Sequence, residues 1–421
     1  MSDVEKTPNE QLIEFINTYL IDKTYDGDEL EIRFGINNYN QITKIDFDNI
    51  IQKLKSLGFR CNNSEGDYTL NIINEYADPN TGKIKDSNIR TTIIGVNAIQ
   101  EYCKENIIRD NKLNNVQFLQ KFRKKDRNKN TLYPINFNDF QFRVNYKTER
   151  DLTPENIDSI RPEIIQLLDT WRDNRKIFRF IKRYTFQHEN TNKYPFKFDL
   201  SVVKTNKQTR KYNKRKVLIK EYSIQDANVF NEPENFEVEM ELLNPIAKRG
   251  EDNTNEVLIK KIKSGIKIIL SGWQKTNFPI SFKEQDLILK QYMTLIHGQN
   301  LPLNRNGKPR FAHSGDFLGP SSVSLETKNI MSLDVDSSTP NINNHYTVTD
   351  KADGERKLLY ISNNGRIYLI DTNMKIQFTG SITKHESYHN SIIDGEHVLN
   401  DKQGNFINLF LCFDIYFENK K

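Results

Sequence analysis

Between residues 29 and 242 the sequence returns again and again to one pattern, in which charged or polar residues alternate with apolar ones. Residues 29–34 read ELEIRF and residues 237–241 read EVEME. Side chains of a β-strand point alternately to its two faces, so each stretch predicts a strand with one charged and one packed face. Further strands are predicted at residues 68–73, 89–94, 118–125, 140–148, 177–186, 196–203 and 217–223. Because few helices interrupt them, these strands favour a closed antiparallel eight-stranded β-tunnel.

Helices are predicted where apolar residues recur at helical spacing. They cover residues 7–16, 46–57, 257–270 and 281–296, with a long helical insertion at 153–171. Ser281 and Glu284 form the sequence pattern of a capping box at the start of one of them. Residues 300–314 are rich in Asn, Pro, Gly and Arg and predict a linker, and strands resume near residue 346.

A chain of 421 residues exceeds one usual hydrophobic core, so more than one domain is expected. We expect an α+β protein in three parts: residues 1–245 form the β-tunnel with its flanking helices, 246–315 a helical connector and linker, and 316–421 a second α+β domain. The three cysteines form no C-x-x-C pair, which excludes a structural zinc pattern and favours a reducing, intracellular and cytoplasmic location. Neither a signal peptide nor a membrane span is recognisable.

The net charge of +5 is small beside 61 basic and 56 acidic residues, which indicates charges sorted into sites. Glu237, Glu239 and Glu241 share one face of their strand, and Glu29 and Glu31 share one face of theirs. Two such strands facing each other would form an oxygen-only site, which suits Mg²⁺ or Mn²⁺.

Other strands carry the opposite charge in the same alternating way. Arg143 and Lys147 share a face, as do Arg179 and Arg183, and Asp199 lies on the next strand. Cross-strand ion pairs on a solvated sheet face would explain one such strand. Repetition over five or six strands favours instead a tunnel whose basic walls bind the oxygens of a metal-bound triphosphate.

Residues 351–356, KADGER, match the pattern Lys-x-Asp-Gly-x-Arg. An amine beside an arginine and a small-residue turn suits attack by Lys351 on the α-phosphate of a nucleotide triphosphate. The alternative is a surface Asp-Gly turn within a hairpin.

The first acidic strand, the arginine-rich strands and the late Glu-x-Glu-x-Glu resemble the triphosphate tunnel metalloenzymes, in the branch of fungal and large DNA virus RNA triphosphatases. The resemblance implies that Glu29, Glu31 and Glu241 bind the metal directly, with Glu237 and Glu239 beside them. It also implies that phosphates are bound by Arg143, Lys147, Arg179 and Arg183. Asp199 would belong to the same substrate site. One position departs from the family: Ile181 stands between the two arginines, where the family often has Lys. The neighbouring Lys182 need not replace that lysine.

Residues 392–396 (IIDGE) and 410–416 (FLCFDIY), with the earlier Gly319-Pro320, resemble motifs of the covalent nucleotidyltransferases, which include capping guanylyltransferases and polynucleotide ligases. The resemblance implies a lysine-linked GMP on Lys351 formed from GTP. Arg356 and Glu396 would hold the ribose, and Phe413 would stack on the base.

Together the two resemblances imply an mRNA 5′-capping enzyme that acts on 5′-triphosphate RNA and GTP, in the host cytoplasm or virion if viral. Later nucleotidyltransferase motifs have no counterpart here, so we expect a truncated second domain. The chain is then either a fragment of a longer capping enzyme, a split gene product whose remainder and a cap methyltransferase come from a separate chain, or a protein in which only the triphosphatase half works. A polynucleotide ligase and a non-catalytic RNA-binding capping subunit remain as alternatives. Free nucleotide triphosphates and polyphosphate remain possible substrates.

Overall fold

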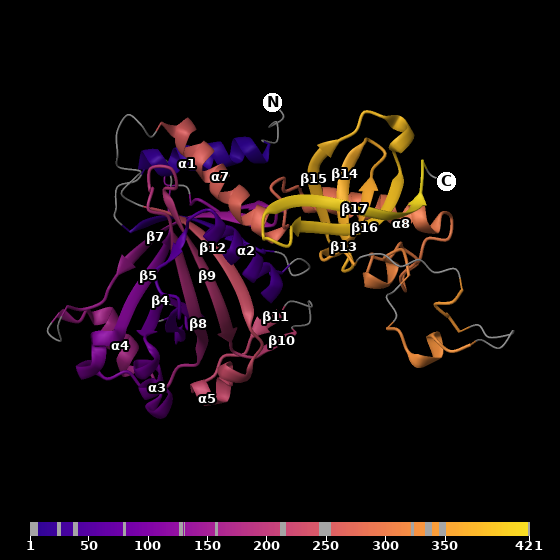
Figure 1. Cartoon of the computed structure of the whole chain (residues 1–421). Helices are drawn as coiled ribbons and strands as arrows, with labels where there is room; N and C mark the ends of the chain where they lie inside the picture. Colours follow the sequence, from indigo (N-terminus) through magenta and orange to yellow (C-terminus); the bar gives the residue numbers. More distant parts are fainter. Residues whose placement is uncertain are drawn as a thin grey trace. The chain divides into compact units, whose positions relative to one another are not determined.

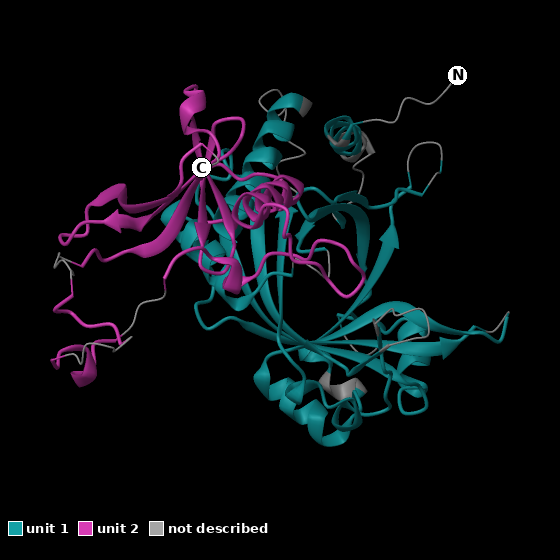
Figure 2. Ribbon diagram, turned by 90° about the vertical axis from the view of Figure 1, so that its right-hand side faces the viewer, with its two compact units in different colours: residues 1–273 teal, residues 274–421 magenta. Residues whose placement is uncertain are grey.

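The computed structural model divides the chain into two compact units, Met1–Trp273 and Gln274–Lys421 (Figure 2). It describes residues 7–22, 27–36, 41–78, 81–125, 129, 131–155, 159–210, 216–243, 254–320, 324–332, 339–344 and 351–419. The expected domain boundary at 245 and the expected return of strands near 346 lie outside these residues. Within the described part, no helix is long and apolar enough to cross a membrane.

The first unit contains a closed antiparallel barrel (Figure 1). Its strands follow one another around the wall in the order β1 (Asp28–Phe34), β12 (Asn235–Leu242), β9 (Phe196–Thr205), β8 (Lys176–Gln187), β3 (Asp67–Ala77), β4 (Ile84–Ile94), β5 (Val116–Arg123) and β7 (Phe142–Asp151). The pairing of β7 with β1 closes the ring. The predicted eight-stranded tunnel is therefore confirmed. Two short strands pair with its members, β2 (Arg60–Cys61) with β8 and β6 (Ile135–Phe137) with β7.

The apolar faces of β1 and β12 pack against helices outside the barrel. Leu30, Ile32 and Met240 are almost completely buried there. Three helices belong to this side of the unit: α1 (Pro8–Asp22), α2 (Lys44–Ser56) and α7 (Asn255–Trp273). Gly265 of α7 comes so close to β12 that a Cβ atom would lie 2.5 Å from the sulfur of Met240. Only glycine allows this approach.

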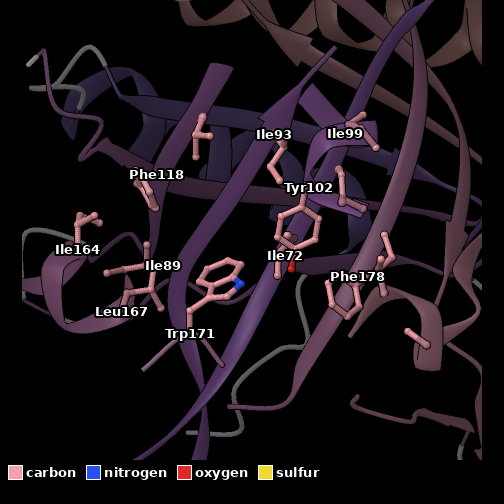
Figure 3. Close-up of a cluster of buried hydrophobic side chains, with 14 of the residues drawn as sticks. Ile72, Ile89, Ile93, Ile99, Tyr102, Phe118, Ile164, Leu167, Trp171 and Phe178 are labelled. Carbon is pink, nitrogen blue, oxygen red and sulfur yellow. The ribbon is translucent and has the colours of Figure 1, made fainter. Parts of the chain in front are cut away.

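A second apolar cluster covers the opposite strands (Figure 3). Trp171 meets Tyr102 edge to face at 6.2 Å, and its indole N–H donates to the carbonyl of Asn106. The cluster is closed by α3 (Val96–Glu105) and α4 (Pro162–Asp169). Helix α3 was not predicted. The helical insertion predicted at 153–171 contains a shorter helix, α4, which starts only where Pro162 occupies the first helical position.

The predicted strand at 217–223 does not join the barrel. Only β11 (Lys216–Leu218) forms there, and it pairs with β10 (Gln208–Arg210) in a separate hairpin. The residues that follow turn into the short helix α5 (Ile224–Ala227), capped by the side chain of Ser223. Short 3₁₀ turns complete the described elements: η1 (Asp110–Asn115), η3 (Val229–Asn231), η4 (Ser314–Asp316), η5 (Thr327–Asn329) and η6 (Glu386–Tyr388).

The second unit is built on a five-stranded antiparallel sheet. Its order is β15 (Ile376–Ile382), β14 (Arg366–Asp371), β13 (Glu355–Ile361), β16 (Ser391–Asn400) and β17 (Phe406–Phe417). Helix α8 (Phe282–His297) starts at the predicted cap, where Ser281 accepts from the amide of Glu284. Tyr292 of α8 packs edge to face on Tyr360 in the core. Residues 246–315 were predicted as a connector. In the structure α7 belongs to the first unit and α8 belongs to the second.

Candidate active sites in the two units

Ion pairs that skip a strand show which side chains line the tunnel. Arg179 on β8 contacts Glu237 on β12 at 2.9 Å, although β9 lies between these strands. Lys121 on β5 contacts Glu29 on β1 at 3.7 Å across β7. Side chains of non-neighbouring strands can meet in this way only on the concave side of a closed sheet. The charged faces therefore point into the barrel.

The predicted carboxylates form one continuous acidic wall. Strands β1 and β12 are neighbours, and Glu31 lies directly opposite Glu241 in their register. Glu29 and Glu239 lie on the same two inward faces. Each carboxylate also meets a basic side chain, as in the contacts Lys147–Glu31 at 3.6 Å and Lys197–Glu241 at 3.0 Å.

Crowding of these carboxylates changes their protonation. Burial, followed by repulsion from Glu149, raises the pKa of Glu29 to about 7. Burial, followed by repulsion from Glu31, raises the pKa of Glu239 to about 7. Burial also raises the pKa of Glu241. The acidic wall therefore favours either a proton or added positive charge.

The predicted basic side chains lie on neighbouring parts of the same interior. Arg183 contacts Asp199 at 3.6 Å, and Asp199 also accepts a hydrogen bond of 2.6 Å from Thr185. Burial lowers the pKa of Arg183, but Asp199 and the three glutamates of β12 outweigh this and raise it above its ordinary value. Arg143 lies opposite Arg33 on β1, and its Nε donates to Asn136 at 2.7 Å. The structure thus brings together all the tunnel residues that the sequence analysis named.

Further charged residues of the described interior were not predicted, among them Arg33, Arg90, Lys121, Glu149 and Lys197. Arg33 could have been predicted from the alternation of charged and apolar residues along its strand, because it shares a face with Glu29 and Glu31. The ion partners of the others come from strands distant in sequence, so pairing order was needed to find them. Ile181 is buried, and Lys182 lies over the ring of Tyr68 at 5.1 Å on the opposite strand face, so it does not replace a tunnel lysine.

The donor set of the acidic wall fits a hard divalent cation. Among the described residues, no group of three or more His, Cys, Asp or Glu side chains is already arranged to hold a metal ion. The four glutamates nevertheless offer oxygen only, which is the ligand that Mg²⁺ and Mn²⁺ prefer. Burial, together with repulsion between neighbouring carboxylates, raises the pKa values of Glu29 and Glu239, and a bound cation would oppose both effects.

The second unit brings the nucleotidyltransferase-like motifs together on β13 and β16. Lys351 is exposed and precedes β13, which begins at Glu355. Arg356 lies directly opposite Glu396 in the register. The amide of Gly354 donates to the carboxylate of Glu396 at 3.2 Å. The turn that carries the lysine is thus joined to the second motif.

Arg356 is held by a buried carboxylate whose role the sequence analysis missed. Asp394 is 1% exposed and accepts two bonds from the guanidinium, of 3.1 and 2.6 Å. Tyr416 donates a third bond to it, of 2.7 Å. Gly319, at φ +116°, passes so close that a Cβ atom would lie 2.6 Å from Arg356, which explains the glycine of the Gly-Pro segment. Phe413 lies on β17 with 60% of its surface exposed.

The sequence of the second unit matches a known family. Residues 280–420 match the family model described as mRNA capping enzyme, catalytic domain. A probable mRNA-capping enzyme of Acanthamoeba polyphaga mimivirus is 29% identical over 185 residues, which cover 44% of this chain and 13% of that protein. Residues 280–420 are thus similar to the catalytic domain of mRNA capping enzymes.

Solved structures of capping triphosphatases are also similar. The RNA triphosphatase domain of a mimivirus capping enzyme shares 16% identity and a TM-score of 0.38, covering 63% of this chain and 99% of that one. The Pct1 RNA triphosphatase of S. pombe shares 13% identity and a TM-score of 0.34, covering 63% of this chain and 92% of that one. The tunnel architecture of this chain is established by its own strand pairing.

Proposed function

We propose that the tunnel, predicted at residues 1–245, removes the γ-phosphate of 5′-triphosphate RNA, and that the second domain begins guanylyl transfer on Lys351. One observation carries the first half of the proposal. Strands β1 and β12 place Glu29, Glu31, Glu239 and Glu241 on one inward wall of a closed barrel whose other strands carry Arg and Lys. The match of residues 280–420 to the capping catalytic domain supports the second half.

The acidic wall is the proposed site for Mg²⁺ or Mn²⁺. Glu29, Glu31 and Glu241 would hold the cation, with Glu237 and Glu239 beside them. Such a cation supplies positive charge against phosphate oxygens and lowers the pKa of water. Glu237 has a further task, because it is bound to Arg33 at 2.6 Å and to Arg179 at 2.9 Å. It orients these two guanidinium groups within the tunnel.

The basic residues would bind and orient the triphosphate. Arg179, Arg183 and Lys147 come from two different strands and face one interior. Arginine forms paired hydrogen bonds with phosphate oxygens, and fixed positive charge stabilises the negative charge that develops during phosphoryl transfer. Asp199 and Thr185 would hold Arg183 in place.

In the second domain, the Nζ of Lys351 would attack the α-phosphate of GTP. A phosphorus–nitrogen bond forms, the bond to the bridging oxygen breaks, and pyrophosphate leaves with that electron pair. Glu396 would accept from the ribose hydroxyls. Arg356 is already held by Asp394, which also accepts a hydrogen bond from Tyr416, so the remaining N–H groups of Arg356 would be oriented before GTP arrives.

The tunnel reaction is tested by incubating the full chain with γ-labelled triphosphate RNA and Mg²⁺ or Mn²⁺, with and without EDTA. Wild type should release labelled phosphate, EDTA should abolish the release, and Glu31→Ala should lower it roughly 100-fold or more. Glu163→Ala on the exposed face of α4 is the matched control and should match wild type. Equal release by Glu31→Ala and wild type would remove the basis of the proposal.

The second reaction is tested by labelling with α-labelled GTP and, separately, α-labelled ATP. A protein-bound GMP that is lost in Lys351→Ala and kept in Lys402→Ala supports guanylyl transfer. Labelling by ATP in place of GTP would instead assign the domain to the ligases.

A further inference from the structure

The segment at residues 310–320 of the second unit ends beside Arg356. The carbonyl of Pro320 accepts a hydrogen bond from Nη1 of Arg356, and the ring of Phe317 lies 5.5 Å from the guanidinium carbon. Asp394 takes two further N–H groups of this arginine. A guanidinium carries five N–H donors, so these contacts leave others for a substrate. The position of residues 317–320 therefore helps to determine where these donors point.

One buried carboxylate, that of Asp316, holds this segment in its turn. The side chain is 3% exposed, and its two oxygens accept from the guanidinium of Arg310, each at 2.6 Å. The amide of His313 donates to the same carboxylate at 2.9 Å, at the start of η4. The hydrogen bonds from Arg310 are the main reason why the pKa of Asp316 is lowered to about 2. Asp316 is thus a charged acceptor at neutral pH.

Helix α8 holds the same segment through Tyr292. The hydroxyl of Tyr292 donates to the backbone carbonyl of Asp316 at 2.8 Å and accepts from the amide of Leu318 at 3.0 Å. Burial raises the pKa of Tyr292 to about 12, so the hydroxyl keeps the proton that it donates. One buried hydroxyl therefore fixes the backbone on both sides of Phe317.

The buried pair of Arg310 and Asp316 has a clearer geometric effect than energetic one. Desolvation of two charges offsets much of their attraction, so a buried ion pair contributes little stability by itself. What such a pair does is favour one arrangement of the chain over others. The arrangement favoured here brings Phe317 and Pro320 against Arg356.

We infer that Arg310 and Asp316 are positioning residues for GTP in the second unit. They hold residues 317–320 against Arg356 and so orient the donors with which Arg356 meets the nucleotide. The inference rests on the proposed guanylyl transfer and adds two residues that lie outside its motifs. Because the pair acts through Arg356, its loss should weaken GTP binding only while Arg356 is present.

The test is a double-mutant cycle in the full chain, made of Asp316→Asn, Arg356→Lys and the two combined. Arg356→Lys keeps the charge and loses the planar group that reaches both Asp394 and Pro320. The probe is GTP with a fluorophore on its γ-phosphate. Its affinity is measured by anisotropy, which requires no transfer to Lys351.

Two further variants and a control accompany the cycle. Arg310→Ala/Asp316→Ala removes both charges, so neither is left buried without its partner. Tyr292→Phe removes one hydroxyl and disturbs the fold least. Glu386→Gln, on an exposed side chain in η6 of the same unit, is the control. Far-UV circular dichroism checks that each variant is folded.

Asp316→Asn and Arg310→Ala/Asp316→Ala should each bind the probe about tenfold more weakly than wild type, and Tyr292→Phe about threefold more weakly. Glu386→Gln should bind as wild type does. In the Arg356→Lys background, Asp316→Asn should weaken binding by less than about twofold. With α-labelled GTP, the KM for labelling should rise in parallel, while the rate at saturating GTP stays within about threefold of wild type.

Equal probe affinity in wild type and the three segment variants would overturn the inference. So would an equal loss in the Arg356 and Arg356→Lys backgrounds, which is the result that a general loss of structure predicts. Wild type that does not bind the probe would overturn it as well. Failure of guanylyl transfer would appear separately, as probe binding without labelling of Lys351.

Discussion

Both units are built on antiparallel sheets, but they hold their charged residues in different ways. The barrel of the first unit closes on itself, and its inward glutamates meet arginines and lysines from across the interior. The sheet of the second unit is open in the described part, and β17 at its edge exposes large apolar side chains such as Phe406 and Ile415. Lys351 lies ahead of the sheet, in an exposed turn.

This difference shows two ways of holding charged side chains in place. In the tunnel, closure buries the carboxylates and also brings like charges together, and burial is the larger cause of the raised pKa values of Glu29 and Glu239. In the second unit, a buried carboxylate, Asp394, holds Arg356 in place, while Lys351 is exposed to solvent. Substitutions in the two units should therefore have different effects. In the first unit they should lower activity, and in the second they should lower local stability.

The largest contrast is expected between two adjacent residues of β8. Arg183 points into the tunnel toward Asp199, whereas Lys182 lies over the ring of Tyr68 on the other face. Arg183→Ala should lower kcat/KM for phosphate release roughly 100-fold, because a fixed charge is lost from the phosphate site. Lys182→Ala should change kcat/KM by about twofold or less, since it removes only the cation–π contacts with Tyr68 and Tyr184 outside the tunnel. Similar losses in both variants would show that strand alternation does not define the site.

Asp394 tests the second unit. Asp394→Asn leaves the guanidinium of Arg356 without its carboxylate, so the opening free energy of β13 and β16 should fall by about 2 kcal/mol. Hydrogen exchange of these amides measures it, and GMP labelling should fall in parallel. The control is Asp414→Asn on β17, where the side chain is exposed and the change should stay within about 0.5 kcal/mol. Unchanged exchange in Asp394→Asn would mean that the buried pair does not stabilise the sheet.

The smallest effect concerns pH. The pKa values of Glu29 and Glu239 lie near 7 in the folded protein, above their ordinary 4.5, so folding binds protons between these values. Without divalent cations, the stability of the first unit should therefore fall as pH rises from 4.5 to 7. At pH 8 in EDTA, Glu29→Gln/Glu239→Gln should raise the Tm by roughly 2 to 4 °C, equivalent to about 1 kcal/mol.

Fluorescence reports this unit selectively, because both tryptophans, Trp171 and Trp273, belong to it. Adding Mn²⁺ should raise the Tm of wild type more at pH 8 than at pH 5.5 and should leave the double variant unaffected. Glu163→Gln is the control on an exposed helix face. If the Tm of wild type rose with pH relative to the Tm of the double variant, the pKa values of Glu29 and Glu239 would not be raised in the folded protein.

Part of the barrel and of its site could be predicted from the alternation of charged and apolar residues along the strands. Glu29, Glu31, Arg179 and Arg183 were found because side chains two residues apart share a face. The position of Lys121 against Glu29 could not be found in this way, since it depends on which strands become neighbours. Residues 217–223 were read as a barrel strand because their β-branched residues resemble one, whereas the pairing of β11 with β10 and the anchoring of Asn206 depend on tertiary contacts.

The second unit was predictable mainly through its motifs. The motifs gave no pairing of strands; in the structure the end of KADGER lies on β13, which pairs with the strand β16 that carries IIDGE. The role of Asp394 was missed because an Asp-Gly pair reads equally well as a turn. Its burial against Arg356 and Tyr416 requires three distant segments to meet.

The central claim is that phosphate release belongs to the tunnel and not to the lysine motif. It is tested most directly by measuring release of labelled γ-phosphate from triphosphate RNA by Glu239→Gln and by Lys351→Ala, each in the full chain. Our account predicts a loss of roughly 100-fold or more in Glu239→Gln and a rate within about twofold of wild type in Lys351→Ala. Undiminished release by Glu239→Gln, or its loss in Lys351→Ala alone, would contradict the account.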